Sequence, residues 1–268
     1  MIMDISFVIV NYKSKAFVLN CIKSIEEAVF GDLRYEIIVV DNNSDDTIGQ
    51  ILSWQHPKTI FIKSEKNLGM GGGNNLGLRR ARGKYKVVMN PDTLAFADTF
   101  SKLFRFMEEN PEIGMVGPKQ FHPDRTTQDS CYRWHSLLTP IFRRTFLGGL
   151  GDKEIARFLM RDYDKQKPRA VDWLLGSCLF IRSKALTEVG LFDERFFLYF
   201  EDTDLCRRFW DKNWQVYYYP SASIIHNHNR ASARQPWYTF FMSAASRHHL
   251  KSWLRYTMKW GLKNPVSH

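Results

Sequence analysis

The sequence predicts an α/β fold with a mostly parallel central sheet flanked by helices. Strand-like and helix-like segments alternate through the first ninety residues, and the strand-like segments are continuous apolar, β-branched runs. Such runs are typical of strands covered on both faces, which parallel sheets require. Polar turn residues follow the expected strands, where ligands of open α/β sheets bind.

The expected elements of the first part follow in order. Ile5 to Tyr12 is a β-branched run, and the run that follows Tyr35 ends in the turn residues Asp41 to Ser44. The expected strands are 5–12, 35–44, 59–65 and 85–93, and the expected helices are 17–30 and 74–83.

The pattern becomes less regular from about Gly117. Residues 120–170 are rich in arginine, aromatic residues and turn formers, which predicts loops and short helices. Trp173 to Ile181 is expected to form one core strand followed by a helix, and 214–220 another strand. There are no internal repeats.

Composition narrows the class of protein. The chain has 268 residues, 44% of them apolar, which suffices for one large domain or two closely packed halves. Its four cysteines form no C-x-x-C pair, which argues against a zinc ribbon or a disulfide framework. The start of the chain does not resemble a secretory signal, and no apolar run is long enough to span a bilayer. We therefore expect a cytoplasmic protein.

The glycine-rich segment 67–77, NLGMGGGNNLG, is the first candidate ligand site. It does not fit G-x-G-x-x-G, and the chain has no G-x-x-x-x-G-K-[ST], so a Rossmann dehydrogenase or a P-loop NTPase is disfavoured. Two interpretations remain open. Asn74 and Asn75 open a helix whose N–H groups meet a phosphate, or the segment is a flexible turn capped by asparagine.

Three polar turns are expected to meet at one edge of the sheet. They are Asn11 and Tyr12, Asp41 to Ser44, and Asn90 to Thr93. Asp92 offers a carboxylate to Mg²⁺ or Mn²⁺, which often bind one or two protein carboxylates together with substrate phosphates. His226 lies in HNHN, and imidazole also suits Mn²⁺, although such histidines are more often surface residues.

The segment 196–208, FFLYFEDTDLCRR, places three carboxylates directly after an aromatic run. One interpretation is a helix start, with Glu201 and Asp202 in the first turn and Arg207 and Arg208 close enough to pair with Asp204. The other is a catalytic site, because buried carboxylates need a partner or a reaction to compensate for lost hydration.

Taken together, the motifs resemble the family-2 glycosyltransferases of the GT-A fold, in particular their rhamnosyltransferase-like branch. The motifs are VIVNYKS, VVDNNSDD, NLGMGGGNNLGLRRARGKYKVVMNPDT, DWLLGSCLFIRSKALTEVGLFDERFFLYFEDTDLCRR and SASIIHNHNRAS. The resemblance runs through roughly residues 4–232 and implies one catalytic domain over 1–229. Within it, a Rossmann-like nucleotide-sugar-binding half covers 1–117 and an acceptor half covers 118–229.

The resemblance also implies roles for single residues. Asp202 would be the general base, over an aromatic floor for the acceptor sugar, and Glu201 would orient the acceptor or the loop. The donor nucleotide would meet the turn at Asn11 and Tyr12, with Asp41 reading the base. The other residues implied near the ribose, the diphosphate and the metal are Asn67, Gly69, Asn75, Asn90, Asp92 and His226. Asn90 replaces the first aspartate of the family's DXD motif, which leaves the metal fewer charged ligands.

The resemblance implies an inverting glycosyltransferase that uses a divalent cation, Mg²⁺ or Mn²⁺. The favoured donor is dTDP-L-rhamnose, and the expected acceptor is a cell-envelope polysaccharide or a lipid-linked oligosaccharide. A UDP-sugar donor is the alternative. A basic nucleic-acid-binding protein would leave the acidic turns unused, and an NAD-dependent oxidoreductase is disfavoured by the glycine segment.

The end of the chain, 230–268, is expected to be a basic, aromatic helical segment. It holds seven Lys and Arg residues and no Asp or Glu. One interpretation is that it docks on an anionic membrane surface, so that the enzyme is peripheral on the inner face of the plasma membrane. The other is that its aromatic residues, among them Trp253, Tyr256 and Trp260, pack on the catalytic domain or a second subunit.

Overall fold

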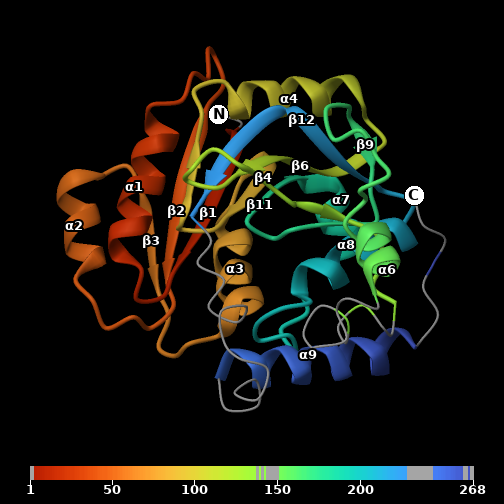
Figure 1. Cartoon of the computed structure of the whole chain (residues 1–268). Helices are drawn as coiled ribbons and strands as arrows, with labels where there is room; N and C mark the ends of the chain where they lie inside the picture. The colour runs from red at the N-terminus through yellow and green to blue at the C-terminus, as the bar shows by residue number, and fades with distance from the viewer. Residues whose placement is uncertain are drawn as a thin grey trace.

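Strands and helices alternate through the first part of the chain, as predicted (Figure 1). The computed structural model describes residues 3–136, 139, 142, 151–227, 244–261 and 265. The elements up to Glu109 are β1 (Met3–Asn11), α1 (Lys15–Glu26), β2 (Tyr35–Asp41), α2 (Ile48–Gln55), β3 (Ile60–Lys63), α3 (Gly69–Arg80), β4 (Gly83–Met89), β5 (Thr93–Ala95) and α4 (Thr99–Glu109). Those that follow are β6 (Ile113–Phe121), β7 (Thr127–Gln128), β8 (Cys131–Tyr132), α6 (Asp152–Phe158), β9 (Arg169–Ala170), β10 (Trp173–Leu174), β11 (Cys178–Arg182), α7 (Ser183–Val189), α8 (Glu201–Asp211), β12 (Gln215–His226) and α9 (Ala244–Trp260).

The central sheet has the order β3-β2-β1-β4-β11-β6-β12-β5, with β7 paired to β6 and β9 paired to β12. The four strands of the first part pair in parallel, and β11 then joins β4 antiparallel. The sheet is therefore mixed, with parallel pairing among β1 to β4 and antiparallel pairing where β11 joins them. β8 and β10 form a separate two-stranded sheet.

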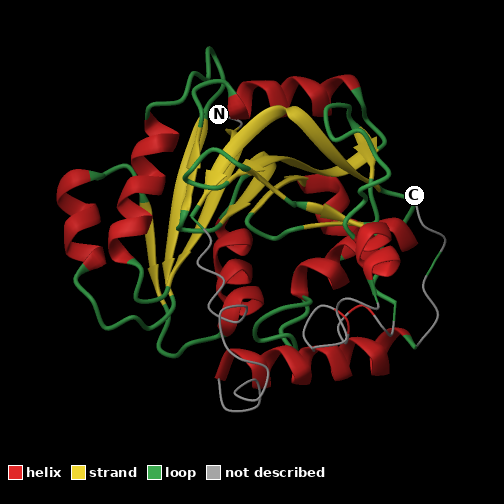
Figure 2. Cartoon of the chain, in the orientation of Figure 1, coloured by secondary structure: helices red, strands yellow, loops and turns green. Residues whose placement is uncertain are grey.

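Helices cover both faces of the sheet (Figure 2). Val8 and Val10 of β1 pack on the side of α3, α7 and α8, whereas Phe7 and Ile9 pack on the side of α1, α2 and α4. Successive side chains of a strand point to opposite faces, so both kinds of position must be apolar here. This is why the first strand is apolar at every position from Phe7 to Val10.

The glycine-rich segment differs from both interpretations of the sequence. α3 begins at Gly69, so Asn74 and Asn75 lie inside the helix and are buried. The glycines serve close packing: a Cβ at Gly77 would lie 2.3 Å from Val8 Cγ1, and one at Gly69, where φ is +73°, would lie 2.1 Å from the Phe197 carbonyl oxygen. Helix α3 can approach the sheet and the Phe197 backbone only because these side chains are missing.

The expected single strand from Trp173 to Ile181 is also wrong. β10 ends at Leu174 and β11 starts at Cys178, and the two belong to different sheets. Gly176 lies in the turn between them, where its N–H donates to Asp202 Oδ2. The apolar run is thus interrupted by a turn whose backbone N–H is bonded to the side chain of Asp202.

Helix α9 lies along one side of the molecule, next to the start of α8 (Figure 1). Trp253, Tyr256 and Trp260 pack with Phe196, Phe200 and Tyr199 in a small cluster of their own. No helix in the described part of the chain has the length and apolar character needed to cross a bilayer.

Candidate active site

Asn11 and Asp41 lie side by side at the ends of β1 and β2. They are register partners, and Asn11 Nδ2 lies 3.0 Å from Asp41 Oδ1. The same nitrogen lies 2.9 Å from Ser44 Oγ, and the Ser44 N–H donates to Asp41 Oδ1. Asn11 and Asp41 are buried and Tyr12 is exposed at the mouth of the turn.

Asn42 is a residue that the sequence interpretation passed over. Its Nδ2 donates to Asn67 Oδ1 at 3.1 Å and to the Gly69 carbonyl at 2.9 Å, and its Oδ1 accepts the Leu68 N–H. Asn67 Oδ1 also accepts the Gly69 N–H. This buried amide fixes the start of α3 beside the end of β2, and its only sequence signal was its place inside the turn after Asp41.

Asn75 connects α3 to the loop before α8. Its Nδ2 donates to the Phe192 carbonyl and to Glu194 Oε1, both at 2.9 Å, and its Oδ1 accepts the Phe192 N–H. These bonds use the whole amide, and the residue is buried. The structure thus gives Asn75 a bridging position, and direct contact with a nucleotide stays a prediction.

Asp92 and His226 come together from distant parts of the sequence. β5 and the end of β12 pair, which brings His226 Nε2 to 3.5 Å from Asp92 Oδ1. The other ring nitrogen of His226 lies 3.0 Å from Gln128 Oε1, and the histidine is buried, unlike a surface residue. Gln128 had no distinguishing signal in the sequence.

These residues fit a cation that is shared with a substrate. Asn90 Oδ1 is buried without a hydrogen-bond partner among the described residues, and Asp92 remains partly exposed. A carboxylate, an imidazole and an amide oxygen suit Mg²⁺ or Mn²⁺. No group of three or more His, Cys, Asp or Glu gathers for a metal within the described ranges, so substrate oxygens would have to complete the coordination.

Asp202 and Glu201 begin α8, so the helix-start interpretation is correct for the backbone. Asp202 Oδ2 accepts the Gly176 N–H at 2.9 Å and Oδ1 accepts the Thr203 N–H at 2.7 Å. Glu201 Oε2 is buried and has no hydrogen-bond partner in the described part of the chain. Both Phe200 and Tyr199, directly before the pair, have left-handed φ values of 67° and 68°.

The environment of the pair changes both acidities. Burial raises the pKa of the Glu201 carboxyl from 4.5 to about 8, and the charge of Asp202 adds to this effect. Burial also raises the pKa of Asp202, against the opposing hydrogen bonds from the Gly176 and Thr203 backbone. The backbone hydrogen bonds stabilise the charge of Asp202, and Glu201 Oε2 has no such partner among the described residues, so a proton shared by the pair is favoured on Glu201.

The remaining acid of this segment is structural. Asp204 is fully buried and pairs with Arg208 at 2.9 Å, as the helix-start interpretation predicted, and with Lys259 at 2.7 Å. Arg207 instead lies over the Trp260 ring, 4.4 Å from its centroid.

The expected aromatic floor beneath an acceptor sugar is wrong. Phe196 and Phe200 are buried and pack with Tyr256 of α9. Phe197 stacks on His248, with centroids 4.7 Å apart, and Tyr199 lies against His249. The aromatic residues before Glu201 therefore hold α9 against this loop, because α9 has aromatic side chains that pack on them.

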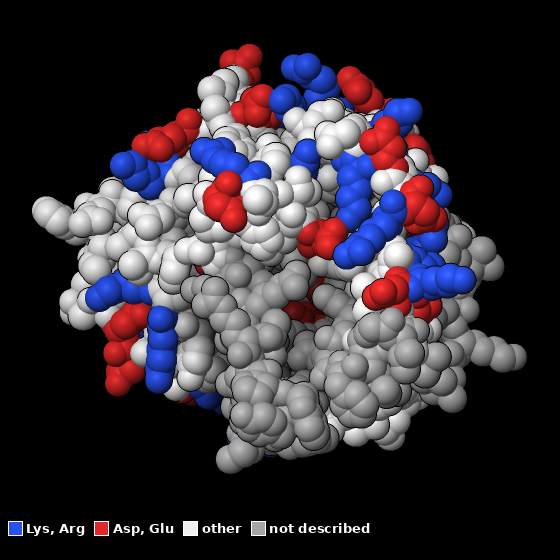
Figure 3. All heavy atoms as spheres, in the orientation of Figure 1, with Lys and Arg blue, Asp and Glu red and all other residues white. Residues whose placement is uncertain are grey.

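A hollow opens near the middle of the face shown in Figure 3, with acidic atoms visible inside it. In the orientation of Figure 1 it falls between α3 and α8. Backbone contacts connect the sites around it: the Asn90 N–H donates to the Ser177 carbonyl, and the neighbouring Gly176 N–H donates to Asp202. The turn at Asn90 and the acidic pair are therefore joined through the backbone of Gly176 and Ser177.

The fold is an α/β fold with polar turns at the ends of its strands, and comparison with known proteins identifies its family. The family model "Glycosyl transferase family 2" matches residues 6–189, so the chain belongs to glycosyltransferase family 2. It is an enzyme of this family with rhamnosyltransferase-like homologues.

Two curated relatives are rhamnosyltransferases. An N-acetylglucosaminyl-diphospho-decaprenol L-rhamnosyltransferase of Mycobacterium tuberculosis is 27% identical over 251 residues, which cover 86% of this chain and 80% of the relative. Rhamnosyltransferase WbbL of Escherichia coli is 27% identical over 243 residues, which cover 87% and 86%.

Solved structures agree on the GT-A fold. A mannosyltransferase of Pyrobaculum calidifontis, solved with GDP-Man and Mn²⁺, superposes with a TM-score of 0.63 at 16% identity and covers 99% of this chain. GalNAc-T7, solved with UDP, GalNAc and Mn²⁺, gives a TM-score of 0.69 at 14% identity and covers 97%. This chain spans 66% and 48% of those two chains, respectively.

Proposed function

We propose that the protein is an inverting glycosyltransferase that moves L-rhamnose from dTDP-L-rhamnose to a lipid-linked or cell-envelope glycan. The observation that carries the reaction type is the partly buried pair Glu201–Asp202, in which two backbone N–H groups stabilise the charge of Asp202 and burial favours the protonated form of Glu201. Inverting transfer needs one ionised carboxylate to take the proton of the acceptor hydroxyl as its oxygen attacks the anomeric carbon.

Asp202 is the proposed base. Its two oxygens are oriented by backbone N–H groups that cannot rotate away, and its raised pKa makes it a stronger acceptor than an exposed aspartate. Glu201, protonated, would donate a hydrogen bond to a sugar hydroxyl from Oε2, which has no hydrogen-bond partner among the residues that the structure describes. Its protonation also avoids a second negative charge beside the base.

The donor diphosphate would lie at the strand ends. Asn90, Asp92 and His226 are the residues proposed to hold a divalent cation, which would neutralise the leaving diphosphate when bound. Asn11, Tyr12 and Asp41 are proposed to receive the nucleoside, with Asn67 and Gly69 shaping the adjoining turn.

The sugar and acceptor rest on the relatives. Both rhamnosyltransferases match along most of their own length, and the name of the mycobacterial relative states a polyprenyl-diphosphate-linked acceptor. Those names support L-rhamnose as the transferred sugar and a lipid-linked acceptor for this chain. The choice of dTDP as the carrier nucleotide rests on the resemblance found in the sequence.

A donor panel tests the proposal. The full chain is incubated with dTDP-L-rhamnose, UDP-GlcNAc, UDP-glucose and GDP-mannose, with Mn²⁺ and a lipid-linked N-acetylglucosamine acceptor, and released nucleotide and product are measured. We expect turnover with dTDP-L-rhamnose alone. The anomeric configuration of the product should be opposite to that of the donor. Turnover with a UDP-sugar only would contradict the donor, and retained configuration would contradict the mechanism.

A further inference from the structure

Helix α9 presents an outward face that no described part of the chain covers. Exposed residues recur along it at spacings of three and four, which place them on one side of a helix. They are Arg247, Leu250, Lys251, Leu254 and Met258. The three apolar members are 38%, 47% and 85% exposed, in chain order.

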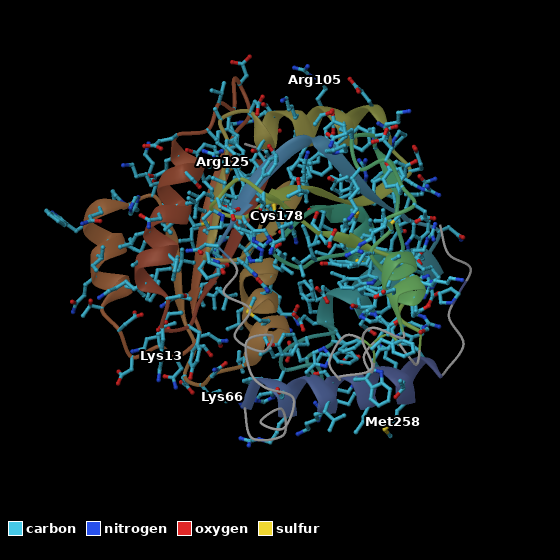
Figure 4. The ribbon with its side chains drawn as sticks, in the orientation of Figure 1. Lys13, Lys66, Arg105, Arg125, Cys178 and Met258 are labelled. Atoms are coloured by element: carbon cyan, nitrogen blue, oxygen red, sulfur yellow. The ribbon has the colours of Figure 1, made fainter. Side chains whose placement is uncertain are left out.

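The opposite face of α9 is fully engaged. Tyr256 is buried, Ser252 Oγ donates to the Leu198 carbonyl at 2.8 Å, and Trp260 Nε1 donates to Asp204 Oδ1 at 2.8 Å. These contacts set the rotation of the helix on the protein. The apolar side chains of the other face consequently point away from the body, and Figure 4 shows this for Met258.

The basic residues of α9 differ in how far they are exposed. The helix has no Asp or Glu. Lys259 pairs with Asp193 and Asp204, and the Arg255 guanidinium donates to the Arg195 carbonyl, so both face the protein. Arg247 and Lys251 remain exposed beside the apolar residues. Of the basic residues of the expected membrane-docking segment, those of α9 that can meet an anionic surface are thus limited to these two.

The same side of the molecule carries further basic residues. Lys13 and Lys66 are exposed and lie on the side of Met258 in Figure 4, whereas Arg105 of α4 marks the opposite side. A convex helix with aliphatic side chains and flanking cations offers no groove for a peptide. It does fit the boundary between headgroups and acyl chains of an anionic bilayer.

We propose that the outer face of α9 docks the enzyme on an anionic lipid surface. Leu250, Leu254 and Met258 enter the headgroup region, and Arg247 and Lys251 meet the anionic headgroups. Binding by three apolar side chains and a few cations is weak and reversible. The loop ahead of Glu201 lies directly on the inner side of α9, so docking holds the acidic pair near the lipid surface.

Flotation of the full chain with vesicles tests this surface. The probes are vesicles of phosphatidylcholine alone and of phosphatidylcholine with 30% phosphatidylglycerol, at low and high salt. The α9 variants are Leu254→Ser with Met258→Ser, and Arg247→Gln with Lys251→Gln. The matched controls are Val29→Ser with Trp54→Ser, which are exposed elsewhere, and Lys58→Gln with Arg105→Gln. Circular dichroism of each variant verifies its folding.

We expect salt-sensitive binding to the anionic vesicles, lowered about 30-fold by the Arg247 and Lys251 changes. The Leu254 and Met258 changes lower it on the order of ten-fold or more, and the controls leave it unchanged. Absence of binding, or equal binding by the α9 variants and the controls, overturns the proposal. A third outcome also overturns it: analytical ultracentrifugation shows that the wild type is a dimer and the α9 variants are not, and the wild type does not bind vesicles. A second copy of the chain would then cover this face.

The inference does not depend on the proposed donor or acceptor. Vesicle binding is measured without substrates, and Asp202→Asn is expected to bind vesicles as the wild type does. Failure of the donor panel with intact vesicle binding would therefore reject the proposed function alone.

Discussion

At the scale of single residues, the two adjacent carboxylates differ in their partners more than in their position. Both oxygens of Asp202 accept backbone N–H groups, whereas one oxygen of Glu201 has none among the described residues. Two like charges buried together cannot both ionise at low cost. The partners therefore assign the charge to Asp202 and the proton to Glu201.

Asp202→Asn is expected to lower turnover by about 10²- to 10⁴-fold, because the amide cannot accept the acceptor proton. Donor affinity should change little, since the shape is kept. Initial rates with saturating donor, together with calorimetric titration of the nucleotide, measure the two effects. Near wild-type turnover in this variant, with loss of turnover in Glu201→Gln, would make Glu201 the base instead.

Glu201→Gln is expected to stabilise the fold increasingly as pH rises. The pKa of Glu201 is raised by burial from 4.5 to about 8, so the folded state disfavours the ionised form. The wild type thus loses stability between these two pH values, and glutamine, which cannot ionise, does not. The difference in melting temperature between variant and wild type should grow from pH 4.5 to 8 and then level off.

Glu65→Gln, an exposed position, provides the matched control for that measurement. A difference in melting temperature that does not vary with pH would show that Glu201 keeps an ordinary acidity in the folded protein.

Asp92→Ala is expected to weaken Mn²⁺-dependent binding of dTDP at least ten-fold, since it removes the only carboxylate of the NPDT turn. Titration of dTDP with and without Mn²⁺ measures this, with Asp98→Ala as the control for an exposed aspartate on the same segment. Full activity after exhaustive chelation would exclude a role for the cation.

At the scale of elements, α3 begins earlier in the sequence than its residue pattern predicts. Five glycines or asparagines in a row suggest a loop, since glycine disfavours helix interiors by about 1 kcal/mol. Packing against β1 and β2 overrides that preference, because Val8 and Val40 occupy the space that larger side chains would need.

Gly77→Ala is expected to destabilise the fold by about 1–3 kcal/mol, although alanine favours helices. The added methyl would lie 2.3 Å from Val8 Cγ1, in the centre of the sheet. The free energy of unfolding in urea measures the effect, with Arg80→Ala at the exposed end of α3 as the control. A variant as stable as the wild type would mean that α3 can shift outward without loss.

The strands of the first part could be predicted because each is a continuous apolar run, and the structure confirms them within a few residues. Helices α2 and α4 were passed over, although Phe100, Leu103 and Met107 show helical spacing. β10 and β11 were predicted as one strand, because the periodicity of apolar residues does not show that two segments belong to different sheets.

The residues of the site could be named from their motifs, but their contacts could not. Nothing local to Gln128 indicates that β7 would bring it to His226, since that contact spans nearly a hundred residues. The aromatic run before Glu201 was likewise assigned to a sugar because its partner, Tyr256, lies far along the chain.

At the scale of the whole molecule, the loop before α8 is tied to both α3 and α9. Asn75 ties it to α3, the Met70 N–H donates to its Phe197 carbonyl, and Ser252 ties it to α9. The acidic pair consequently depends on the glycine-rich helix on one side and on the C-terminal helix on the other. The boundary at residue 229 between catalytic domain and C-terminal segment stays a prediction.

The buried Asp204 fixes α9 to the body of the protein. Among the described residues its carboxylate contacts the side chains of Lys259 and Trp260, which belong to α9, and that of Arg208. If α9 peeled away, the loss of Lys259 would leave that carboxylate undercompensated, at a cost on the order of 3 kcal/mol. A few weak lipid contacts do not supply this energy. The helix therefore binds the bilayer together with the rest of the enzyme as one rigid body. The tilt of α9 on the bilayer then sets the distance between the acidic pair and the lipid surface.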